Sequence, residues 1–533
     1  MIELDVLSAA QTAADEDAQA AAGQAPTWRS RAGRDGALGA LAQNEFLPDA
    51  PVTEADEGTS RRSFLKVMGA SAALAGMTGC RRPVETILPY ARKPEDVVPG
   101  VPTYFATAMP LGGVGHALLV QSHEGRPTKV EGNPEHPISG GSTDLFAQAS
   151  VLQLYDPDRS RHVWMRGEGE PARADWGAFV AAAGRLRAQS GAVAVLAEPS
   201  ASPTADALRD RFLAATPGAR WITLHPHLDD HQALGTQQAL GQPARPLYRF
   251  AQADVIVSLD ADFIGAEDPN SVWNNRQYAA SRRVDERGSM SRLYAIESTM
   301  TTTGGMADHR KAVKAGAVPF VAAAIANGLG VSTGVSPVLA EDMQPFVDAI
   351  VADVQAAGGN AAFVAGAHQP AEVHALAAAL NGQFGGGVVE YLATGAGTVE
   401  PVGPQLEALV RDMQAGQVGT LLMLGTNPVH TLPADLGFEA ALAEVPTSIH
   451  VGLYRDETGQ RATWHVPRTH YLESWGDVRA YDGTLSIVQP LIAPLFADAH
   501  SDLEVLNTLT TGRNNAGYDL LRQAWRQRLP GSF

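Results

Sequence analysis

The sequence predicts an α/β protein whose parallel sheets are covered by helices on both faces, with a small β-rich part ahead of them. The first observation is that short apolar strand patterns alternate with helical patterns from residue 192 onward. Strands that are separated by helices of this length pair in parallel, because the helix carries the chain back along the sheet. The second is a hairpin signal, Glu124-Gly125-Arg126, between two strand patterns. It predicts the β-rich part.

The elements follow from these patterns in chain order. The hairpin strands are expected at 117–122 and 127–131. The strands of the parallel sheets are expected at 192–197, 221–224, 255–259, 293–297, 361–365, 421–424 and 449–453. The intervening helices are expected at 174–189, 205–215, 318–328, 340–358, 371–380 and 404–415. The stretch 464–494 is rich in Tyr, Trp and Pro and is expected to be irregular.

Changes in composition divide the chain into five expected parts. Residues 1–79 form a disordered leader that ends in a signal, because 1–59 is rich in Ala, Asp and Glu without periodicity. Residues 80–103 form an extended, Pro-punctuated arm. Residues 104–160 are the β-rich part. Residues 161–330 and 331–533 are two α/β domains, of which the second carries the irregular C-terminal segment.

Charge and cysteine content exclude several classes of function. The 533 residues include 40 Lys and Arg against 58 Asp and Glu, a formal charge of −18. Nucleic-acid binding needs a basic surface, so nucleic acid is not an expected partner. The chain has one cysteine. It therefore forms neither an intrachain disulfide nor an iron–sulfur cluster held by four of its own cysteines.

The segment 60–66 reads SRRSFLK and precedes a mildly apolar run of about eleven residues, too short to span a bilayer of about 30 Å. This pattern is typical of a twin-arginine export signal, in which a receptor reads Arg61, Arg62, Phe64, Leu65 and Lys66. Such a signal predicts export to the periplasm. An accidental match is the alternative interpretation.

Cys80 follows that run in the pattern of a lipoprotein cleavage site. Acylation there supplies the two or more lipid chains that stable membrane anchoring requires. We therefore expect a lipid anchor at Cys80 and attachment to the membrane surface. An uncleaved leader with an unmodified thiol is the alternative.

Polar residues near strand ends are candidates for metal or nucleotide binding. Asp260 and Asp262 follow a strand, where helix capping or hydrogen bonding in the crevice is the favoured interpretation. His465 and His470 are five residues apart in a segment that contains Pro. This spacing matches no common metal motif, so a structural role is favoured and no metal site is expected.

Tyr471, Trp475 and Tyr481 are interpreted as core residues rather than as a stacking site. The glycines of 112–115 lack the full dinucleotide fingerprint and are assigned to a turn. No nucleophile elbow and no phosphate-binding loop occurs in the sequence, so no catalytic residue is expected.

A longer set of motifs resembles a known superfamily. The block 125–137 reads GRPTKVEGNPEHP and is followed by QAS at 148–150 and LYDPDR at 154–159. This block resembles the N-terminal portion of molybdopterin oxidoreductases. Further stretches narrow the resemblance: SLDADF at 258–263, ADHR at 307–310, LGTNPV at 424–429, YLESWGD at 471–477 and YDGTLSIVQP at 481–490. With the long leader, SRRSFLK and CRRP at 80–83, they resemble the B subunit of alternative complex III, a bacterial quinol:electron-acceptor oxidoreductase.

The resemblance implies a molybdopterin-oxidoreductase-like fold that has lost its cofactor, so no cofactor is expected in this chain. Gly425, Asn427 and Pro428 occupy the turn at which superfamily members contact the dinucleotide, and are expected to be vestigial. The family's B subunits usually continue into a ferredoxin-like half that holds iron–sulfur clusters. We expect that half on a separate polypeptide, or missing.

The resulting hypothesis is a non-catalytic scaffold in respiratory electron transport and quinol oxidation, at the periplasmic face of the bacterial inner membrane. The resemblance implies an iron–sulfur polypeptide, a cytochrome c with haem, and integral membrane subunits as partners. Two alternatives stay open: a periplasmic molybdopterin-dependent oxidoreductase, and a solitary exported lipoprotein with a binding cleft.

Overall fold

A computed structural model describes residues 97–167, 170–186, 192–225, 230–394, 397–529 and 531. The leader, the twin-arginine motif, Cys80 and most of the expected arm lie outside the described residues. Within them, no helix combines the length and the apolar character that crossing a membrane requires.

The β-rich part is a three-stranded antiparallel sheet. Its strands are β1 (Thr103–Leu111), β2 (Val114–His123) and β3 (Arg126–Gly132), in that order. Glu124 and Gly125 both have positive φ, +52° and +83°, and form the tight turn of the expected hairpin. The glycine-rich segment 112–115 is also a turn, between β1 and β2. Helix α5 (Leu145–Leu154) packs on the sheet, and the side chain of Asp144 caps it by accepting from the backbone of Ala147.

A seven-stranded sheet forms the larger α/β layer structure, in the order β5-β4-β16-β15-β14-β6-β7. Five strands run parallel, whereas β4 and β5 pair antiparallel at one edge. The strand bounds are β4 (Val163–Met165), β5 (Ala172–Ala174), β6 (Ala192–Ala197), β7 (Arg220–Thr223), β14 (Val418–Leu424), β15 (Thr447–Gly452) and β16 (Trp464–Pro467). All seven residues of β14 are buried, as expected for a central parallel strand.

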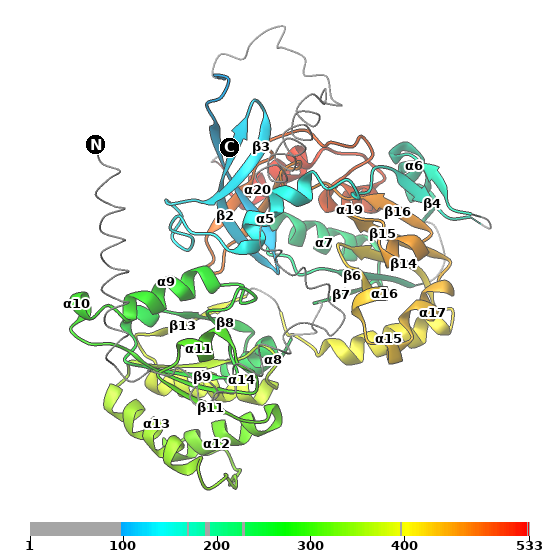
Figure 1. Cartoon of the computed structure of the whole chain (residues 1–533). Coiled ribbons are helices and arrows are strands. Elements are labelled where there is room, and N and C mark those ends of the chain that lie inside the picture. Colours follow the sequence, from blue (N-terminus) through cyan, green and yellow to red (C-terminus); the bar gives the residue numbers. More distant parts are fainter. Residues whose placement is uncertain are drawn as a thin grey trace, which may run out of the picture. The chain divides into compact units, whose positions relative to one another are not determined.

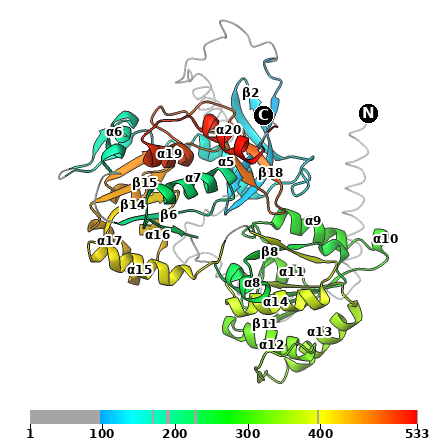
Figure 2. The same cartoon turned by 180° about the vertical axis from the view of Figure 1, so that it is seen from behind.

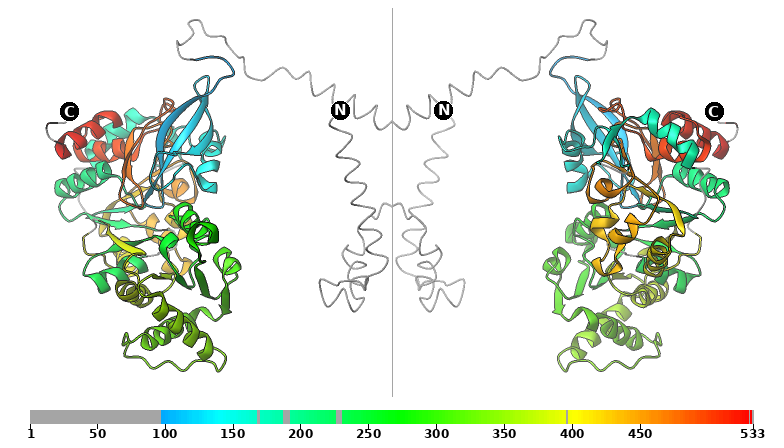
Figure 3. Two further views of the ribbon diagram at one scale, coloured as in Figure 1. Left: turned by 90° about the vertical axis from the view of Figure 1, so that its left-hand side faces the viewer. Right: turned by 90° about the vertical axis from the view of Figure 1, so that its right-hand side faces the viewer.

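Helices cover both faces of this sheet (Figure 1). On one face lie α6 (Trp176–Leu186), α7 (Pro203–Ala215), α19 (Asp502–Thr511) and α20 (Gly517–Arg528). On the other face lie α15 (Val402–Gln414) and α17 (Phe438–Ala443). Figure 3 shows the C-terminal helices α19 and α20 in red, and both contact α7. Helices α19 and α20 therefore contribute to the core of this layer structure.

A second sheet has four parallel strands in the order β11-β10-β9-β12. Its strands are β9 (Val255–Leu259), β10 (Arg292–Glu297), β11 (His309–Ala312) and β12 (Ala361–Ala365). One face packs on α12 (Val318–Gly328), α13 (Gln344–Ala357) and α14 (Ala371–Phe384). The other face packs on η1 (Phe250–Gln252) and α9 (Ser271–Ser281), opposite α12 and α13 in Figure 2.

The four-stranded sheet is inserted into the sequence of the seven-stranded one. The chain leaves after β7, passes α8 (His231–Leu240) and β8 (Ala244–Tyr248), and returns through β13 (Val389–Ala393), which pairs antiparallel with β8. The expected division between residues 330 and 331 falls between α12 and α13, which pack in one core. The structure corrects that division, because strands from before and after it share each sheet.

The segment 464–494 is more regular than expected. It contains β16 and an antiparallel pair, β17 (Gly476–Arg479) and β18 (Leu485–Val488). Both β17 and β18 contact β1. The alternating parallel architecture with helices on both faces confirms the predicted fold class.

Candidate functional site

Parallel sheets with helices on both faces bind ligands at the carboxyl ends of their strands. The sequence places most of the candidate residues at this edge of the two sheets. At the seven-stranded sheet, three charged side chains meet there. Arg468 directly follows β16, Glu198 directly follows β6, and Asp502 begins α19. The guanidinium of Arg468 donates from Nη2 to Glu198 and to Asp502, the second at 2.5 Å. We call these three residues the Arg468 triad.

Gly425 ends β14 beside this triad. Its φ of +66° is a left-handed conformation that favours glycine. A Cβ built on it would lie 2.7 Å from Nη1 of Arg468 and 2.7 Å from Cδ of Glu198. Both separations are shorter than van der Waals contact. The ends of the Arg468 and Glu198 side chains, which are 23% and 41% exposed, therefore lie against this glycine.

Asn427 and Pro428 continue the same turn into the short helix α16 (Pro428–Thr431). Oδ1 of Asn427 accepts from the hydroxyl of Thr458 at 2.7 Å, and Nδ2 donates to Glu457 at 2.8 Å. Both partners lie on α18 (Glu457–Arg461). Through these two bonds the side-chain amide of Asn427 holds α18 in place.

A buried chain of polar groups crosses the same edge beneath the turn. Nδ1 of His450 lies 2.9 Å from Nδ1 of His465, and Nε2 of His465 lies 2.7 Å from the hydroxyl of Ser160. Nε2 of His450 faces two acceptors, the carbonyl of Thr426 at 3.2 Å and Asp456 at 3.6 Å. We therefore assign the His450 proton to Nε2.

This assignment fixes which group donates and which accepts in every hydrogen bond of the buried network. Ser160 donates to His465, His465 donates from Nδ1 to His450, and His450 donates to Thr426. Burial lowers the pKa of His450 and that of His465, so both rings are neutral. His465 lies on strand β16 and not in the irregular segment expected for it. The bonds of this buried network orient the two imidazole rings and the hydroxyl of Ser160.

The corresponding edge of the four-stranded sheet is built around Asp260, which follows β9 with a φ of +58°. Its Oδ1 accepts from the backbone of Ser298 at 2.8 Å. Its Oδ2 pairs with Nε2 of His368 at 2.7 Å and accepts from Gln369 at 3.0 Å. A Cβ on Gly366 would lie 2.0 Å from the carbonyl oxygen of Asp260. The turns after β9 and β12 are thus pressed together, and both carboxylate oxygens are used.

Asp262 and Glu297 also have internal partners. Oδ1 of Asp262 accepts from the backbone and the hydroxyl of Thr303, both at 2.8 Å, in the first turn of α11 (Thr302–Met306). Asp262 thus shows the hydrogen bonding in the crevice that was expected as one of two roles, whereas Thr301 caps α11. Glu297 pairs with Arg310 and accepts from Thr301 at 2.6 Å.

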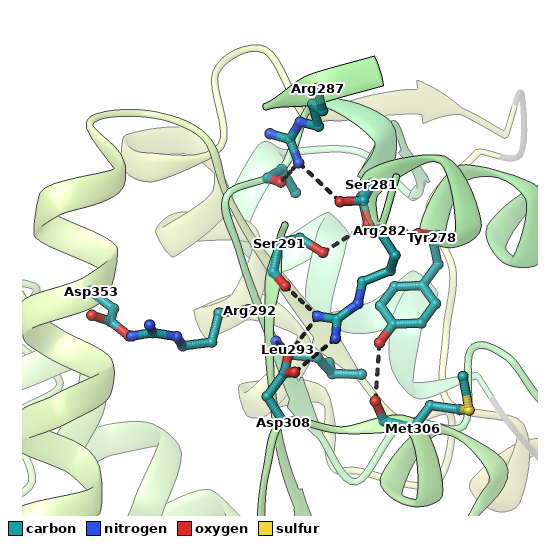
Figure 4. Close-up of polar contacts among 11 residues, drawn as sticks. Tyr278, Ser281, Arg282, Arg287, Ser291, Arg292, Leu293, Met306, Asp308 and Asp353 are labelled. Carbon is teal, nitrogen blue, oxygen red and sulfur yellow. Dashed lines mark hydrogen bonds and ion pairs between the residues drawn. The ribbon is translucent and has the colours of Figure 1, made fainter. Parts of the chain in front are cut away.

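The ADHR motif has a structural role at the opposite ends of these strands (Figure 4). The carboxylate of Asp308 accepts hydrogen bonds from both terminal nitrogens of Arg282, at 2.7 and 2.8 Å. The same carboxylate accepts from the backbone of Leu293 at 2.8 Å. A bidentate pair of this kind has a defined geometry. It fastens the end of α9 to the starts of β10 and β11.

The motifs that carry the family resemblance also contact one another. Arg159 of the LYDPDR stretch and Glu473 of YLESWGD form an ion pair at 2.6 Å, with side chains 1% and 0% exposed. The hydroxyl of Tyr155 donates to the carbonyl of Pro127, within GRPTKVEGNPEHP, at 2.9 Å. The backbone of His470 donates to Glu473 at 2.8 Å. These stretches thus hold the β-rich part on the C-terminal segment.

The three aromatic candidates are dispersed rather than stacked on one another. Tyr471 bonds Ser150 through its hydroxyl at 2.8 Å, Trp475 packs on Tyr518, and Tyr481 is buried beneath Arg245. Sequence reasoning missed the Arg468 triad and His450. Glu198 stands directly after an expected strand, so its position was an available signal. No such signal was available for Arg468 and Asp502, because the sequence did not predict β16 or α19.

At the turn where this kind of sheet edge can bind a pterin cofactor, two positions are in contact with other side chains of the protein. The turn at Gly425 faces the Arg468 triad, and the amide of Asn427 is committed to α18. Within the described ranges, no group of three or more His, Cys, Asp or Glu side chains is placed to hold a metal ion.

Comparison with known proteins gives a sequence relative and a structural neighbour. No protein-family model matches the sequence. The "menaquinone reductase, molybdopterin-binding-like subunit" of Nitratidesulfovibrio vulgaris is 23% identical over 493 residues, covering 82% of this chain and 70% of that protein. The solved structure of acetylene hydratase from Pelobacter acetylenicus superposes with a TM-score of 0.57 and 12% identity, covering 76% of this chain and 69% of that one. At this identity the structural likeness shows the fold alone.

Proposed function

We propose that this chain, whose fold is molybdopterin oxidoreductase-like, is a non-catalytic scaffold subunit of a respiratory quinone oxidoreductase. The observation that carries the proposal is the closed turn at Gly425. A pterin dinucleotide needs backbone that it can approach at a strand's carboxyl end. Here the side-chain ends of Arg468 and Glu198 lie against that turn, and a single carbon added to Gly425 would overlap them.

The sequence relative supports the respiratory part of the proposal, since it is named as a subunit of a menaquinone reductase. We propose that this chain likewise works within an assembly whose other subunits carry the redox centres. The proposed partners are an iron–sulfur polypeptide, a cytochrome c and integral membrane subunits. The finer proposal, that the assembly is alternative complex III, rests on the motif resemblance.

Location and attachment are part of the same proposal. The SRRSFLK segment supports export by the twin-arginine route, and Cys80 supports a lipid anchor on the periplasmic face of the inner membrane. The test replaces Arg61 and Arg62 with Lys, and separately Cys80 with Ser. Retention of the Lys variant in the cytoplasm and loss of acyl mass from mature Cys80→Ser support these assignments. An unmodified wild-type Cys80, or normal export of the Lys variant, contradicts them.

The proposed assembly is tested by purification of the full-length chain through an affinity tag from detergent-solubilised native membranes. We expect haem and iron–sulfur absorbance and quinol oxidation to co-elute with the chain. A matched preparation carries the tag on an unrelated exported lipoprotein and controls for carry-over. Elution of the chain alone, with the quinol-oxidising activity left in the unbound fraction, contradicts the scaffold proposal.

A further inference from the structure

A small polar cavity lies between β2, the segment that follows β3, and the start of α9. Its volume is about 20 Å³, and it also touches Tyr481. The polar side chains that line it include His116, His136, Ser139, Thr143 and Asn270. A cavity needs about 10–15 Å³ to hold one water molecule, so this one has the size of a single water.

Four side-chain atoms at this cavity are buried without a hydrogen-bond partner among the described residues. They are Nε2 of His116, Nε2 of His136, and both Nδ2 and Oδ1 of Asn270. His136 is 8% exposed and Asn270 is 3% exposed. Buried polar atoms in folded proteins nearly always have a partner, because an unpaired one loses its bonds to water without replacement. Four such atoms on three residues that line one cavity therefore indicate a ligand.

The position of Asn270 supports the same conclusion. Asn270 is the N-cap residue of α9, and an N-cap Asn usually accepts a bond from its own helix. Here the side chain makes no capping bond. Instead, Asp268 accepts from the backbone of Asn270 at 2.7 Å. The side-chain amide of Asn270 is therefore available to bond a ligand in the cavity that it lines.

The neighbours of the two histidines determine whether each ring offers a hydrogen-bond donor or an acceptor to the cavity. Nδ1 of His136 accepts from the backbone of Ile138 at 3.3 Å, so the proton of the neutral ring is on Nε2. Nδ1 of His116 lies 3.4 Å from the carboxylate of Asp144, so its proton is on Nδ1 and Nε2 is a free acceptor. Burial lowers the pKa of both rings, which keeps them neutral. The cavity therefore offers a donor at His136, an acceptor at His116, and one of each at Asn270.

We propose that this cavity binds one ordered water molecule that bridges His116, His136 and Asn270. Water matches the site in size, in charge and in its ability to donate and accept at the same time. Bound there, it links β2 of the three-stranded sheet to the N-terminus of α9. This inference is independent of the proposed function, since it involves neither strand-end turn.

The direct test is a crystal structure of the chain at about 1.5 Å resolution. We expect a single density peak within hydrogen-bond distance of at least two of the three side chains. A featureless cavity contradicts the proposal. A peak that refines as a heavier atom with metal-like distances also contradicts it, because it replaces water by a metal ion.

A stability test separates a hydrated from a dry cavity by the sign of the effect. Asn270→Leu keeps the approximate size of the side chain and removes its polar atoms. If the water is present, the variant breaks its bonds and the melting temperature falls by a few degrees. If the cavity is dry, the variant removes two unpaired polar atoms and the melting temperature rises, which contradicts the proposal.

Asn381→Leu is the matched reference for losing a bonded, buried amide. Asn381 is 2% exposed and bonds Phe363 through both amide atoms, at 2.8 and 2.9 Å. We expect Asn270→Leu to shift the melting temperature in the same direction as Asn381→Leu. A shift in the opposite direction contradicts a bridging water. If either variant fails to fold, the crystal structure of the wild-type chain decides the matter alone.

Discussion

At Gly425, a ligand would compete with the side chains of Arg468 and Glu198 for the same space. Superfamily members are expected to present this turn to a dinucleotide, so it needs open room in front of the backbone. In this chain, Arg468 and Glu198 lie where a Cβ of residue 425 would be. A substitution here therefore reports on whether the space is filled.

We predict that Gly425→Ala destabilises the fold more than Gly416→Ala does. Both glycines have a φ of +66°, so both variants suffer the left-handed conformational cost of about 1–2 kcal/mol. Gly416 has no atom within 4 Å of a built Cβ, whereas Gly425 faces Arg468 and Glu198 at 2.7 Å. Moving the partly exposed ends of Arg468 and Glu198 aside weakens their ion pair and adds up to about 1 kcal/mol to the second variant. Urea unfolding of both measures the difference, and equal destabilisation would show that the turn is open.

At the scale of elements, Asp477 on β17 joins two helices that cover the seven-stranded sheet. Its carboxylate accepts from the hydroxyls of Ser202 and Thr204, at 2.5 and 2.6 Å, where α7 begins. It also accepts from the indole of Trp525 on α20 at 2.8 Å. Asp477 is 3% exposed. One buried carboxylate thus holds the C-terminal helix and the start of α7 together.

We predict that Asp477→Ala loosens α20 and the first turn of α7 before the rest of the fold. Loss of a buried acceptor leaves several donors unpaired, at about 1–3 kcal/mol for each. Hydrogen exchange followed by mass spectrometry should show faster exchange in both helices and unchanged exchange in α12 and α13. Asp519→Ala, at an exposed acid in the first turn of α20, is the control, with an expected effect of about 0.3–1 kcal/mol. Uniform acceleration across the chain would refute a local role of Asp477.

Most strands and helices could be predicted from the sequence, but the pairing of the strands could not. The expected strands at 192–197, 255–259 and 361–365 match β6, β9 and β12 in both bounds, because each is an apolar run between turn-forming residues. Strand β16 was not predicted, because His465 and Pro467 interrupt its apolar pattern. Periodicity identifies a strand but carries no information on its partners. The insertion of one sheet within the other was therefore not predictable.

The candidate site shows the same limit. The residues at positions 425–428 could be placed after a strand from the local pattern alone. Their environment comes from Glu198, Arg468 and Asp502, which are far apart in the sequence and meet only because β6 and β16 flank β14 and β15. A closed turn and an open one therefore have the same local sequence signal.

At the scale of the whole molecule, buried histidines couple stability to pH. Burial lowers the pKa of His374 to about 4 and that of His470 to about 3. Both titrate near 6.5 in an unfolded chain. Below pH 6.5 the unfolded chain takes up protons that the folded chain does not, so stability falls as the pH falls toward the folded pKa. Each unit of pKa difference corresponds to about 1.4 kcal/mol.

We predict that His374→Leu gains stability relative to the wild type as the pH falls from about 6.5 to 4, by up to about 3 kcal/mol. Denaturant unfolding of both proteins at several pH values measures the difference between their free energies of unfolding. The contributions of all other titrating groups cancel in this difference.

Asp268→Asn provides a control of opposite sign, because burial raises the pKa of Asp268 to about 7. Its protonated form stabilises the fold at low pH, and this contribution is lost as the pH rises through 7. The Asn variant should therefore lose stability relative to the wild type on acidification. Parallel stability curves for either variant and the wild type would contradict these assignments.

The central claim, that this molybdopterin oxidoreductase-like fold acts as a scaffold without its own cofactor, is tested most directly by molybdenum and pterin analysis of the chain. The chain should be purified from its native host in its assembled form, with a known molybdopterin enzyme from the same cells as the positive control. The account predicts molybdenum and pterin far below one per chain, while iron and haem are retained by the assembly. Stoichiometric molybdenum together with released pterin would contradict it.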